Sequence, residues 1–363
     1  APIFEVILPM TTSARGVDRV CKYYRDFIVG KQHQPFQEGD ITIAEWIGKF
    51  KPDNINVIPL VEDKEHMLDA HNILKNYLED KNPKYHRIFF ARSDPAMNYG
   101  LVSAVLINKI ALQRIYRLSE EMGMEIYPII GVGSAPFRGN LRPDTVERVA
   151  NEYPSVHTFT IQSAFKYDNP PDEVTKAIKV LRDQKRSPPR KVNEEKCLDI
   201  MDRYVEEYTK QIISLAPFIN KISKYVPKRR KRKLHIGLFG YSRSVGEFKL
   251  PRAITFTAAL YSIGIPPELL GLNAITDKDY EYIKDVYVNF EEDLKAALQY
   301  YNPCSDFLPD EIHARIRELD IDYHRNEKHQ ELTSSILDSI KKIKSEDLSE
   351  QVLMAANLRK FLG

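Results

Sequence analysis

The chain has 363 residues, of which 43% are apolar and 29% are charged, and its formal net charge is +2. This length allows one large core with additions or two domains. The balanced charge argues against wholesale nucleic-acid binding, and the absence of an apolar run of about 18 residues argues against a membrane span.

The three cysteines, Cys21, Cys197 and Cys304, are far apart and form no CxxC pair. A sparse, odd set is typical of a reduced cytoplasmic protein rather than of a disulfide framework or a zinc site. The first residues, APIFEVILPM, lack the basic start of a signal peptide and have the composition of a buried strand. Because the chain opens inside such a strand without a methionine, we expect an N-terminal portion to be missing.

Apolar runs rich in β-forming residues recur along the first two-thirds of the chain. They predict strands at 3–10, 54–62, 86–94, 125–133, 156–163 and 233–241, whereas 41–48 is ambiguous between strand and helix. The runs are continuously apolar rather than alternating, which is typical of parallel strands that helices cover.

Amphipathic patterns between these runs predict helices over 64–80, 101–123 and 144–153. The alternation predicts an α/β fold, either a (β/α)8 barrel or a doubly wound sheet. Only six or seven strands are visible, so a barrel needs at least one more strand. A long helix is predicted over 193–224, and only helices are predicted after 251.

Catalytic groups of α/β barrels lie on the loops that follow the carboxyl ends of the strands. Four candidate groups end the predicted strands: Glu62 and Asp63, Arg92 and Asp94, Arg138, and Arg243. A further arginine, Arg252, opens a predicted helix. Together they offer carboxylates for a divalent cation and arginines for a small polyanion that carries phosphate and carboxylate groups.

Glu62 and Asp94 end successive predicted strands, which lie about 4.8 Å apart when they are parallel neighbours. Two carboxylates with open positions suit Mg²⁺ or Mn²⁺, which retain waters and accept substrate oxygens. The alternative is that each carboxylate caps the helix that follows it.

The stretch GVGSAPFRGNLRP, residues 131–143, follows the fourth predicted strand and contains Gly131, Gly133 and Arg138. Glycines before a helix leave backbone N–H groups for an anion, and an arginine adds a bidentate clamp. The stretch has neither the P-loop nor the dinucleotide spacing, so an anion-binding loop and a plain turn both stay open.

Several motifs make the chain resemble the archaeal type of phosphoenolpyruvate carboxylase. The similarity runs from residue 3 to residue 363 and includes FEVILPMTTS, VIPLVED, ARSDPAMNYG, GVGSAPFRGNLRP, LFGYSRSVGEFKLPRAITFTAALYSIGIPPELLG and AANLRKFLG. The resemblance implies a (β/α)8 TIM-type barrel with many additional helices, its first strand missing from this chain. It predicts one catalytic domain over 1–363, with the barrel at about 1–165 and 233–250, a helical insertion at about 170–225 and a helical region at 251–363.

The resemblance also implies an activity, the addition of bicarbonate to phosphoenolpyruvate to give oxaloacetate and phosphate with Mg²⁺ or Mn²⁺. It assigns the metal to Glu62 and Asp94, the carboxylation site to Arg138, and phosphate binding to Arg243 and Arg252. Arg92, Gly131 and Gly133 are the further predicted substrate contacts. A cytoplasmic homotetramer that binds neither nucleic acid nor membrane is expected.

The chain departs from the bacterial and plant pattern of this family. Met97 stands at a lysine position, Arg92 at a tyrosine position and Val132 at an arginine position, so two positive charges are missing. We expect Arg92, Arg15 or Arg142 to compensate.

The family also uses a histidine in a Gln-His-Pro motif, but no His-Pro pair occurs in this sequence. His33 is the nearest match and lies in the wrong place. We therefore expect the first barrel strand and this histidine to belong to the same absent segment.

Three alternatives stay open. The chain could be another metal-dependent barrel lyase or aldolase that acts on a pyruvate-like substrate, or an inactive fragment of the carboxylase. The basic run KRRKRK at 228–233 raises a nucleic-acid-binding protein as the third, although such runs are usually solvated loops.

Overall fold

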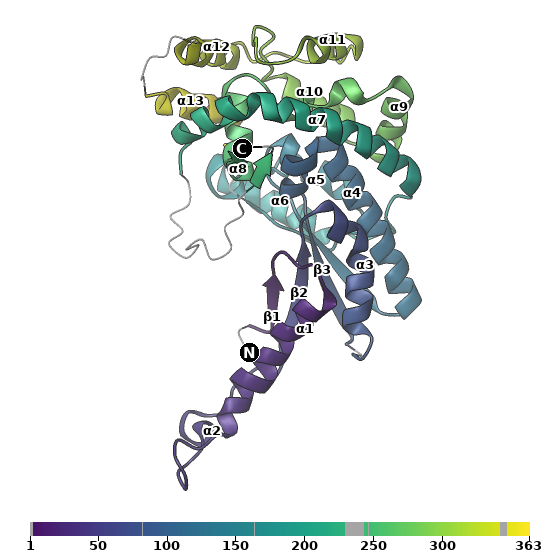
Figure 1. Cartoon of the computed structure of the whole chain (residues 1–363), viewed down its shortest axis with the longest axis vertical. Helices are drawn as coiled ribbons and strands as arrows, with labels where there is room; N and C mark the ends of the chain where they lie inside the picture. Colours follow the sequence, from purple (N-terminus) through teal and green to yellow (C-terminus); the bar gives the residue numbers. More distant parts are fainter. Residues whose placement is uncertain (1–2, 82, 163, 229–242, 246, 342–346) are drawn as a thin grey trace.

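The computed structural model describes residues 3–81, 83–162, 164–228, 243–245, 247–341 and 347–363, with only the backbone of 243–245. The chain forms a parallel sheet, a helical layer on the sheet, and a larger group of helices built from the second half (Figure 1).

Five parallel strands form the main sheet, and they lie side by side in chain order. They are β1 (Glu5–Leu8), β2 (Asn56–Val61), β3 (Tyr85–Ala91), β4 (Glu125–Gly131) and β5 (Thr158–Phe159). Each overlaps a predicted run, and only β3 begins outside its run, one residue early at Tyr85. The parallel α/β prediction is therefore confirmed, with shorter strands than expected. The predicted strand at 233–241 lies outside the described residues.

The ambiguous segment 41–48 is a helix, α2 (Ile43–Ile47). The Thr42 side chain accepts a hydrogen bond from the backbone N–H of Glu45, and the Glu45 carboxylate accepts one from the backbone N–H of Thr42. This capping box satisfies two N–H groups that a helix start leaves without partners. Local capping therefore decides for helix over strand.

Helices connect the strands, and Figure 1 shows α3 and α4 lying along the sheet. The connecting helices are α1 (Ala14–Lys22), α3 (Lys64–Leu78), α4 (Ser93–Met122) and α5 (Val146–Glu152). The predicted helices over 64–80, 101–123 and 144–153 are therefore confirmed. When parallel strands follow chain order, right-handed crossovers place all connecting helices on one face of the sheet.

The sheet curls toward its other face. Arg87 on the central strand β3 donates to Glu5 Oε2 on β1 (3.0 Å) and to Thr158 Oγ1 on β5 (2.9 Å). In a flat sheet the outer strands β1 and β5 would lie about 19 Å apart, four spacings of about 4.8 Å. One guanidinium bridges them only because the sheet is strongly curved.

Where the structure describes it, the second half of the chain is helical apart from one hairpin. The long helix α7 (Glu194–Ile222) crosses the upper half of the molecule in Figure 1 and packs on α4, as the 193–224 pattern predicts. The other elements are α6 (Pro171–Asp183), β6 (Arg243–Val245), β7 (Phe248–Leu250), α8 (Ala253–Ser262), α9 (Asp277–Val286), α10 (Phe290–Leu298), α11 (Asp310–Glu318), α12 (Glu327–Lys341) and α13 (Ser349–Arg359). The antiparallel hairpin of β6 and β7 was not predicted.

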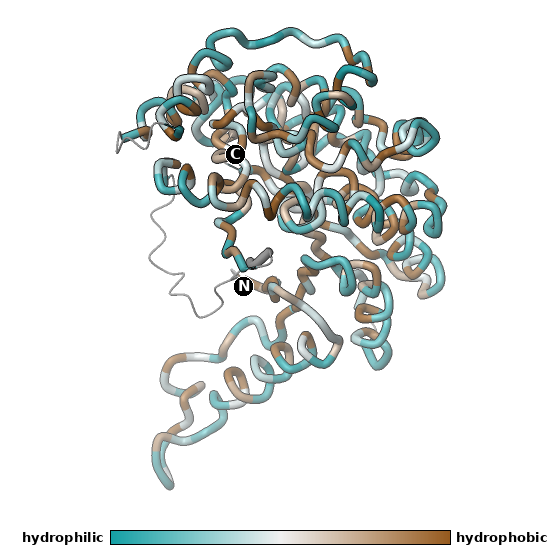
Figure 2. Tube along the Cα trace, turned by 45° about the horizontal axis from the view of Figure 1, so that its top comes forward, coloured by the Kyte–Doolittle hydropathy of each residue, from teal (hydrophilic) through white to brown (hydrophobic). Residues whose placement is uncertain are grey.

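An arm leaves the body after α1 and ends at α2 (Figure 1). It carries hydrophobic stretches along its length (Figure 2), and its Trp46 side chain is 67% exposed. Trp46 is therefore not a core residue.

Within the described residues, no single helix has both the length and the apolar composition to cross a membrane. The bent pair Ala253–Ser262 and Pro267–Ala274 meets those two criteria only when its halves are taken together.

Candidate active site

The carboxyl ends of three neighbouring strands are level with one another. Val61 pairs with Phe90 across β2 and β3, and Ala91 pairs with Gly131 across β3 and β4. Glu62, Ala91 and Gly131 therefore lie on one level at the edge of the sheet. The structure thus places the predicted site residues that follow β2, β3 and β4 at one edge of the sheet, as expected for the carboxyl ends of parallel strands.

The Glu62 and Asp94 carboxylates follow β2 and β3 and are both half-buried. Glu62 Oε2 accepts the backbone N–H of Met10 (3.2 Å), and Asp94 lies in the first turn of α4. The cap of α3 is Asp63, whose Oδ1 accepts the His66 N–H (3.0 Å). The helix-capping alternative therefore does not account for Glu62, since Asp63 is the cap, but it stays open for Asp94 in the first turn of α4.

The donor set at this edge fits a hard divalent cation. Among the described residues, no group of three or more His, Cys, Asp or Glu side chains forms a complete metal cage. A pair of carboxylates that leaves positions for water and substrate oxygens is what Mg²⁺ prefers, whereas zinc prefers a closed set of nitrogen and sulfur ligands.

The Arg138 guanidinium joins several loops at this edge, and its residue is only 3% exposed. Nε donates to Ser93 Oγ (3.2 Å), Nη2 donates to Gln162 Oε1 (2.6 Å), and Nη1 donates to the carbonyl of Gly363. Ser93 directly precedes Asp94, so Arg138 lies one residue from a predicted metal ligand. Its neighbours come from the ends of β3 and β5 and from the C-terminal segment.

The glycines of the 131–143 loop serve the packing of Arg138. A Cβ on Gly133 would lie 2.6 Å from Arg138 Cζ, and one on Gly139, whose φ is +113°, would lie 2.7 Å from Val132 Cγ1. The Gly133 N–H donates to the Arg138 carbonyl (2.8 Å), so this donor is already used. The geometry favours a loop that presents an arginine over a loop that presents backbone N–H groups.

Arg92 lies under this loop and is 1% exposed. Its Nη1 donates to the Phe137 carbonyl (3.1 Å). Burial alone would lower the pKa of Arg92, but Tyr153, Tyr287 and Asp293 hold it above the ordinary value. The structure therefore shows Arg92 supporting the loop, and its predicted contact with substrate stays a prediction.

The other predicted arginines reach this region from different elements. Arg252 is exposed at the start of α8, and Arg243 pairs through its backbone with Leu250, two residues before Arg252. The start of α8 lies beside Gly363, because a Cβ there would be 2.2 Å from the Ile254 carbonyl oxygen. The hairpin thus brings the backbone positions of Arg243 and Arg252 to the same end of α8, near Gly363, whose carbonyl accepts a hydrogen bond from Arg138.

Three residues are expected to compensate for missing charges: Arg92 is the buried loop support, Arg15 lies on the helix that follows β1, and Arg142 lies in the 131–143 loop. Their compensation stays a prediction. Arg15 is exposed on α1, and Arg142 Nε lies 3.5 Å from Asp144 Oδ1.

Two buried carboxyl groups support the loop, and sequence reasoning missed both. Glu268 Oε1 accepts the Phe137 N–H (2.6 Å) and the Tyr261 hydroxyl (2.7 Å), and burial raises the pKa of Glu268 to about 7. Asp293 accepts from Asn140 Nδ2 (2.7 Å) and from the Tyr287 hydroxyl, and burial raises the pKa of Asp293 to about 6. A lone carboxyl group in the apolar stretch IPPELLG was the available signal for Glu268.

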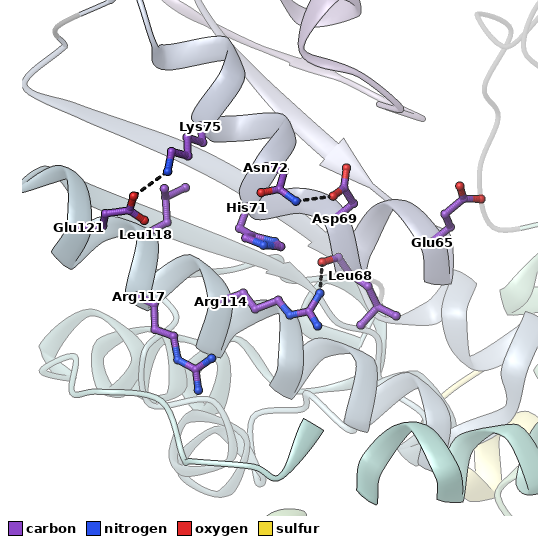
Figure 3. A pocket seen from close by; sticks show the side chains of 10 residues that line it. All are labelled: Glu65, Leu68, Asp69, His71, Asn72, Lys75, Arg114, Arg117, Leu118 and Glu121. Carbon is purple, nitrogen blue, oxygen red and sulfur yellow. Dashed lines mark hydrogen bonds and ion pairs between the residues drawn. The ribbon is translucent and has the colours of Figure 1, made fainter. Parts of the chain in front are cut away.

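A separate open groove of about 710 Å³ lies between α3 and α4 (Figure 3). Its basic side chains are paired: Lys75 Nζ binds Glu121 (2.6 Å), Arg114 binds Glu194 (2.7 Å) and the Leu68 carbonyl (2.6 Å), and Arg117 binds Glu194 (3.2 Å). The groove therefore offers no concentrated charge for a polyanion, and the strand ends stay the candidate site.

The chain is similar in sequence to known proteins along its whole length. The sequence profile of the phosphoenolpyruvate carboxylase family matches residues 1–363. The phosphoenolpyruvate carboxylase of Methanospirillum hungatei is 53% identical over 364 residues, which cover 100% of this chain and 75% of that protein. The enzyme so named from Methanothermobacter thermautotrophicus is 52% identical with the same coverage, and that from Halobacterium salinarum is 44% identical over 100% of this chain and 74% of its own length.

Proposed function

The chain belongs to the phosphoenolpyruvate carboxylase family, and from this premise we propose that it adds bicarbonate to phosphoenolpyruvate, giving oxaloacetate and phosphate. The observation that carries the proposal is the position of Arg138. Its guanidinium contacts Ser93 beside Asp94, at the edge where Glu62 ends the neighbouring strand. An arginine beside two carboxylates suits a substrate that carries phosphate and carboxylate groups.

The proposed reaction has two bond-forming steps. A bicarbonate oxygen attacks phosphorus and the bond from phosphorus to the enol oxygen breaks, which gives carboxyphosphate and the enolate of pyruvate. Carboxyphosphate then separates into CO₂ and phosphate, and the enolate carbon attacks CO₂ to give oxaloacetate. In this scheme Arg243 and Arg252 hold the phosphate, and Arg138 lies beside the carboxylation step.

Glu62 and Asp94 are the residues that would hold Mg²⁺ or Mn²⁺, which supplies positive charge for substrate oxygens and for a developing enolate. The 131–143 loop would exclude water, because protonation of the enolate yields pyruvate instead of oxaloacetate. The burial of residues 132–141 supports this role.

We also propose that the sheet is part of a (β/α)8 barrel with the expected domain boundaries. A doubly wound sheet reverses its strand order at a switch point, whereas the order here runs from β1 to β5 without reversal. The curl seen at Arg87 supports the same interpretation. A homotetramer and a cytoplasmic location stay predictions.

The test is an assay of the protein as its gene encodes it, with any residues that precede Ala1 included. We expect phosphate release from phosphoenolpyruvate that depends on bicarbonate and on a divalent cation, with oxaloacetate formed in step. A metal-dependent lyase or aldolase of another specificity would cleave or condense a pyruvate-like substrate without bicarbonate. That outcome would contradict the proposal.

A further inference from the structure

The loop that carries Arg138 is buried over residues 132–141, so its backbone polar groups need partners within the protein. Five hydrogen bonds inside the loop supply many of them, among them Gly133 N–H to the Arg138 carbonyl and Leu141 N–H to the Gly133 carbonyl. Phe137, which directly precedes Arg138, bonds outside the loop. Its N–H donates to Glu268 and its carbonyl accepts from Arg92.

Glu268 reaches this N–H from a distant part of the chain. It lies in the 3-10 helix η6 (Pro267–Leu269), it is fully buried, and it is 131 residues from Phe137. One of its oxygens, Oε1, takes both the Phe137 N–H and the Tyr261 hydroxyl, while Oε2 has no hydrogen bond within the described residues. A buried carboxyl group with one oxygen unsatisfied is costly for stability, and an apolar side chain would be cheaper there.

The hydrogen bond from Phe137 to Glu268 lies directly before Arg138 and directly before a sharp turn of the loop. The next residues, Gly139 and Asn140, have positive φ values of +113° and +57°, so the backbone turns sharply there. Asp293 holds the far side of this turn through the Asn140 side chain. Glu268, at the N–H, and Arg92, at the carbonyl, thus fix the backbone of Phe137 immediately before Arg138.

We propose that Glu268 is a positioning residue for carboxylation, holding Phe137 N–H so that the Arg138 guanidinium stays against Ser93 and Gln162. The inference rests on the proposed function. A held loop keeps water from the enolate until its carbon attacks CO₂. A loosened loop admits water, whose proton forms the C–H bond of pyruvate and leaves hydroxide.

The test compares products per turnover, which do not depend on how much of the enzyme is folded. Glu268→Met keeps the length of the side chain but removes the acceptor, whereas Glu268→Gln keeps a carbonyl oxygen for both donors. Ser262→Ala is the matched control, because Ser262 is also fully buried on α8 but bonds only to the Ala258 carbonyl in its own helix. Oxaloacetate and pyruvate are quantified together, at saturating bicarbonate, with the protein as its gene encodes it.

We expect Glu268→Met to lower kcat for oxaloacetate about 10-fold, with KM for phosphoenolpyruvate within about 3-fold, because a misplaced loop costs rate more than substrate binding. The pyruvate share should rise several-fold in this variant, while Glu268→Gln and Ser262→Ala keep the wild-type ratio.

A Glu268→Met enzyme with reduced activity but an unchanged product ratio would overturn the positioning role and leave only a folding role. A pyruvate share that rises equally in Ser262→Ala would overturn it as well. If the wild-type protein forms neither product from phosphoenolpyruvate and bicarbonate, the proposed function itself has failed, which is a distinct result.

Discussion

Gly133 and Arg138 are packed so closely that a Cβ on Gly133 would lie 2.6 Å from the Arg138 Cζ atom and 2.9 Å from both terminal nitrogens. The backbone N–H of Gly133 also donates a hydrogen bond to the Arg138 carbonyl, so the two residues are joined through the backbone as well. The guanidinium of Arg138 therefore packs directly against the backbone of Gly133, where only a glycine leaves room for it.

Gly133→Ala should displace the Arg138 guanidinium and lower carboxylation about 10- to 100-fold, because displacement of a catalytic group by about 1 Å has effects of this size. Steady-state oxaloacetate formation measures it. Gly16→Ala is the control, since a Cβ there meets only Ser13 Oγ at an ordinary 3.5 Å. Equal activity of the two alanine variants would show that Arg138 is not needed where it lies.

Three neighbouring acidic residues separate metal binding from helix capping. Glu62→Gln and Asp94→Asn should each lower carboxylation roughly 100-fold or more, since loss of a ligand removes several kcal/mol of charge stabilisation. Asp63→Ala should instead lower the free energy of unfolding by about 1 kcal/mol through the lost cap of α3 and leave kcat close to wild type.

Activity titrated against Mg²⁺ and thermal unfolding distinguish these classes. Unchanged Mg²⁺ dependence in Glu62→Gln and Asp94→Asn would contradict the metal assignment.

The order of the elements and the edge of the site could be predicted because both depend on local patterns. Parallel strands under helices are continuously apolar, and residues such as Glu62 and Asp94 follow directly from where those runs end. The start of α4 could not be placed as well. Gly100, at φ +81°, interrupts the helix, so the periodic pattern begins only after it, whereas the helix itself begins at Ser93.

The supports of the loop could not be predicted because they depend on contacts between distant residues. Glu268 meets Phe137 across 131 residues and Asp293 meets Asn140 across 153 residues. Arg92 presented the opposite problem. Its place at a strand end suggested a substrate contact, but its side chain turns beneath the loop and bonds to the Phe137 carbonyl. A position at a strand end predicts where the backbone of a residue lies, but not where the end of a long side chain points.

Arg87→Met should weaken the curled sheet by removing the hydrogen bonds to Glu5 and Thr158. We expect a loss of about 2 kcal/mol in the free energy of unfolding, since the charged guanidinium donates both bonds, one of them to a carboxylate, and the site is partly shielded from water. Denaturant unfolding measures it, with Arg117→Met as the control, because Arg117 is exposed and forms a surface ion pair with Glu194. Equal stability of both variants would show that the Arg87 bridge does not hold the curvature.

Glu268 should also make stability depend on pH. Burial raises the pKa of its carboxyl group from an ordinary 4.5 to about 7 in the folded protein. Between these values the carboxyl group holds a proton in the folded state but not in the unfolded state, so the contribution of Glu268 to stability is greatest below pH 4.5 and is lost as the pH rises through 7. Glu268→Gln cannot ionise and lacks this loss.

From pH 5 to pH 8 the wild type should therefore lose roughly 2 to 3 kcal/mol of unfolding free energy relative to Glu268→Gln. Denaturant unfolding of both proteins at the two pH values measures the difference. A constant difference between the proteins across this range would mean that Glu268 is already ionised at pH 5 in the folded state.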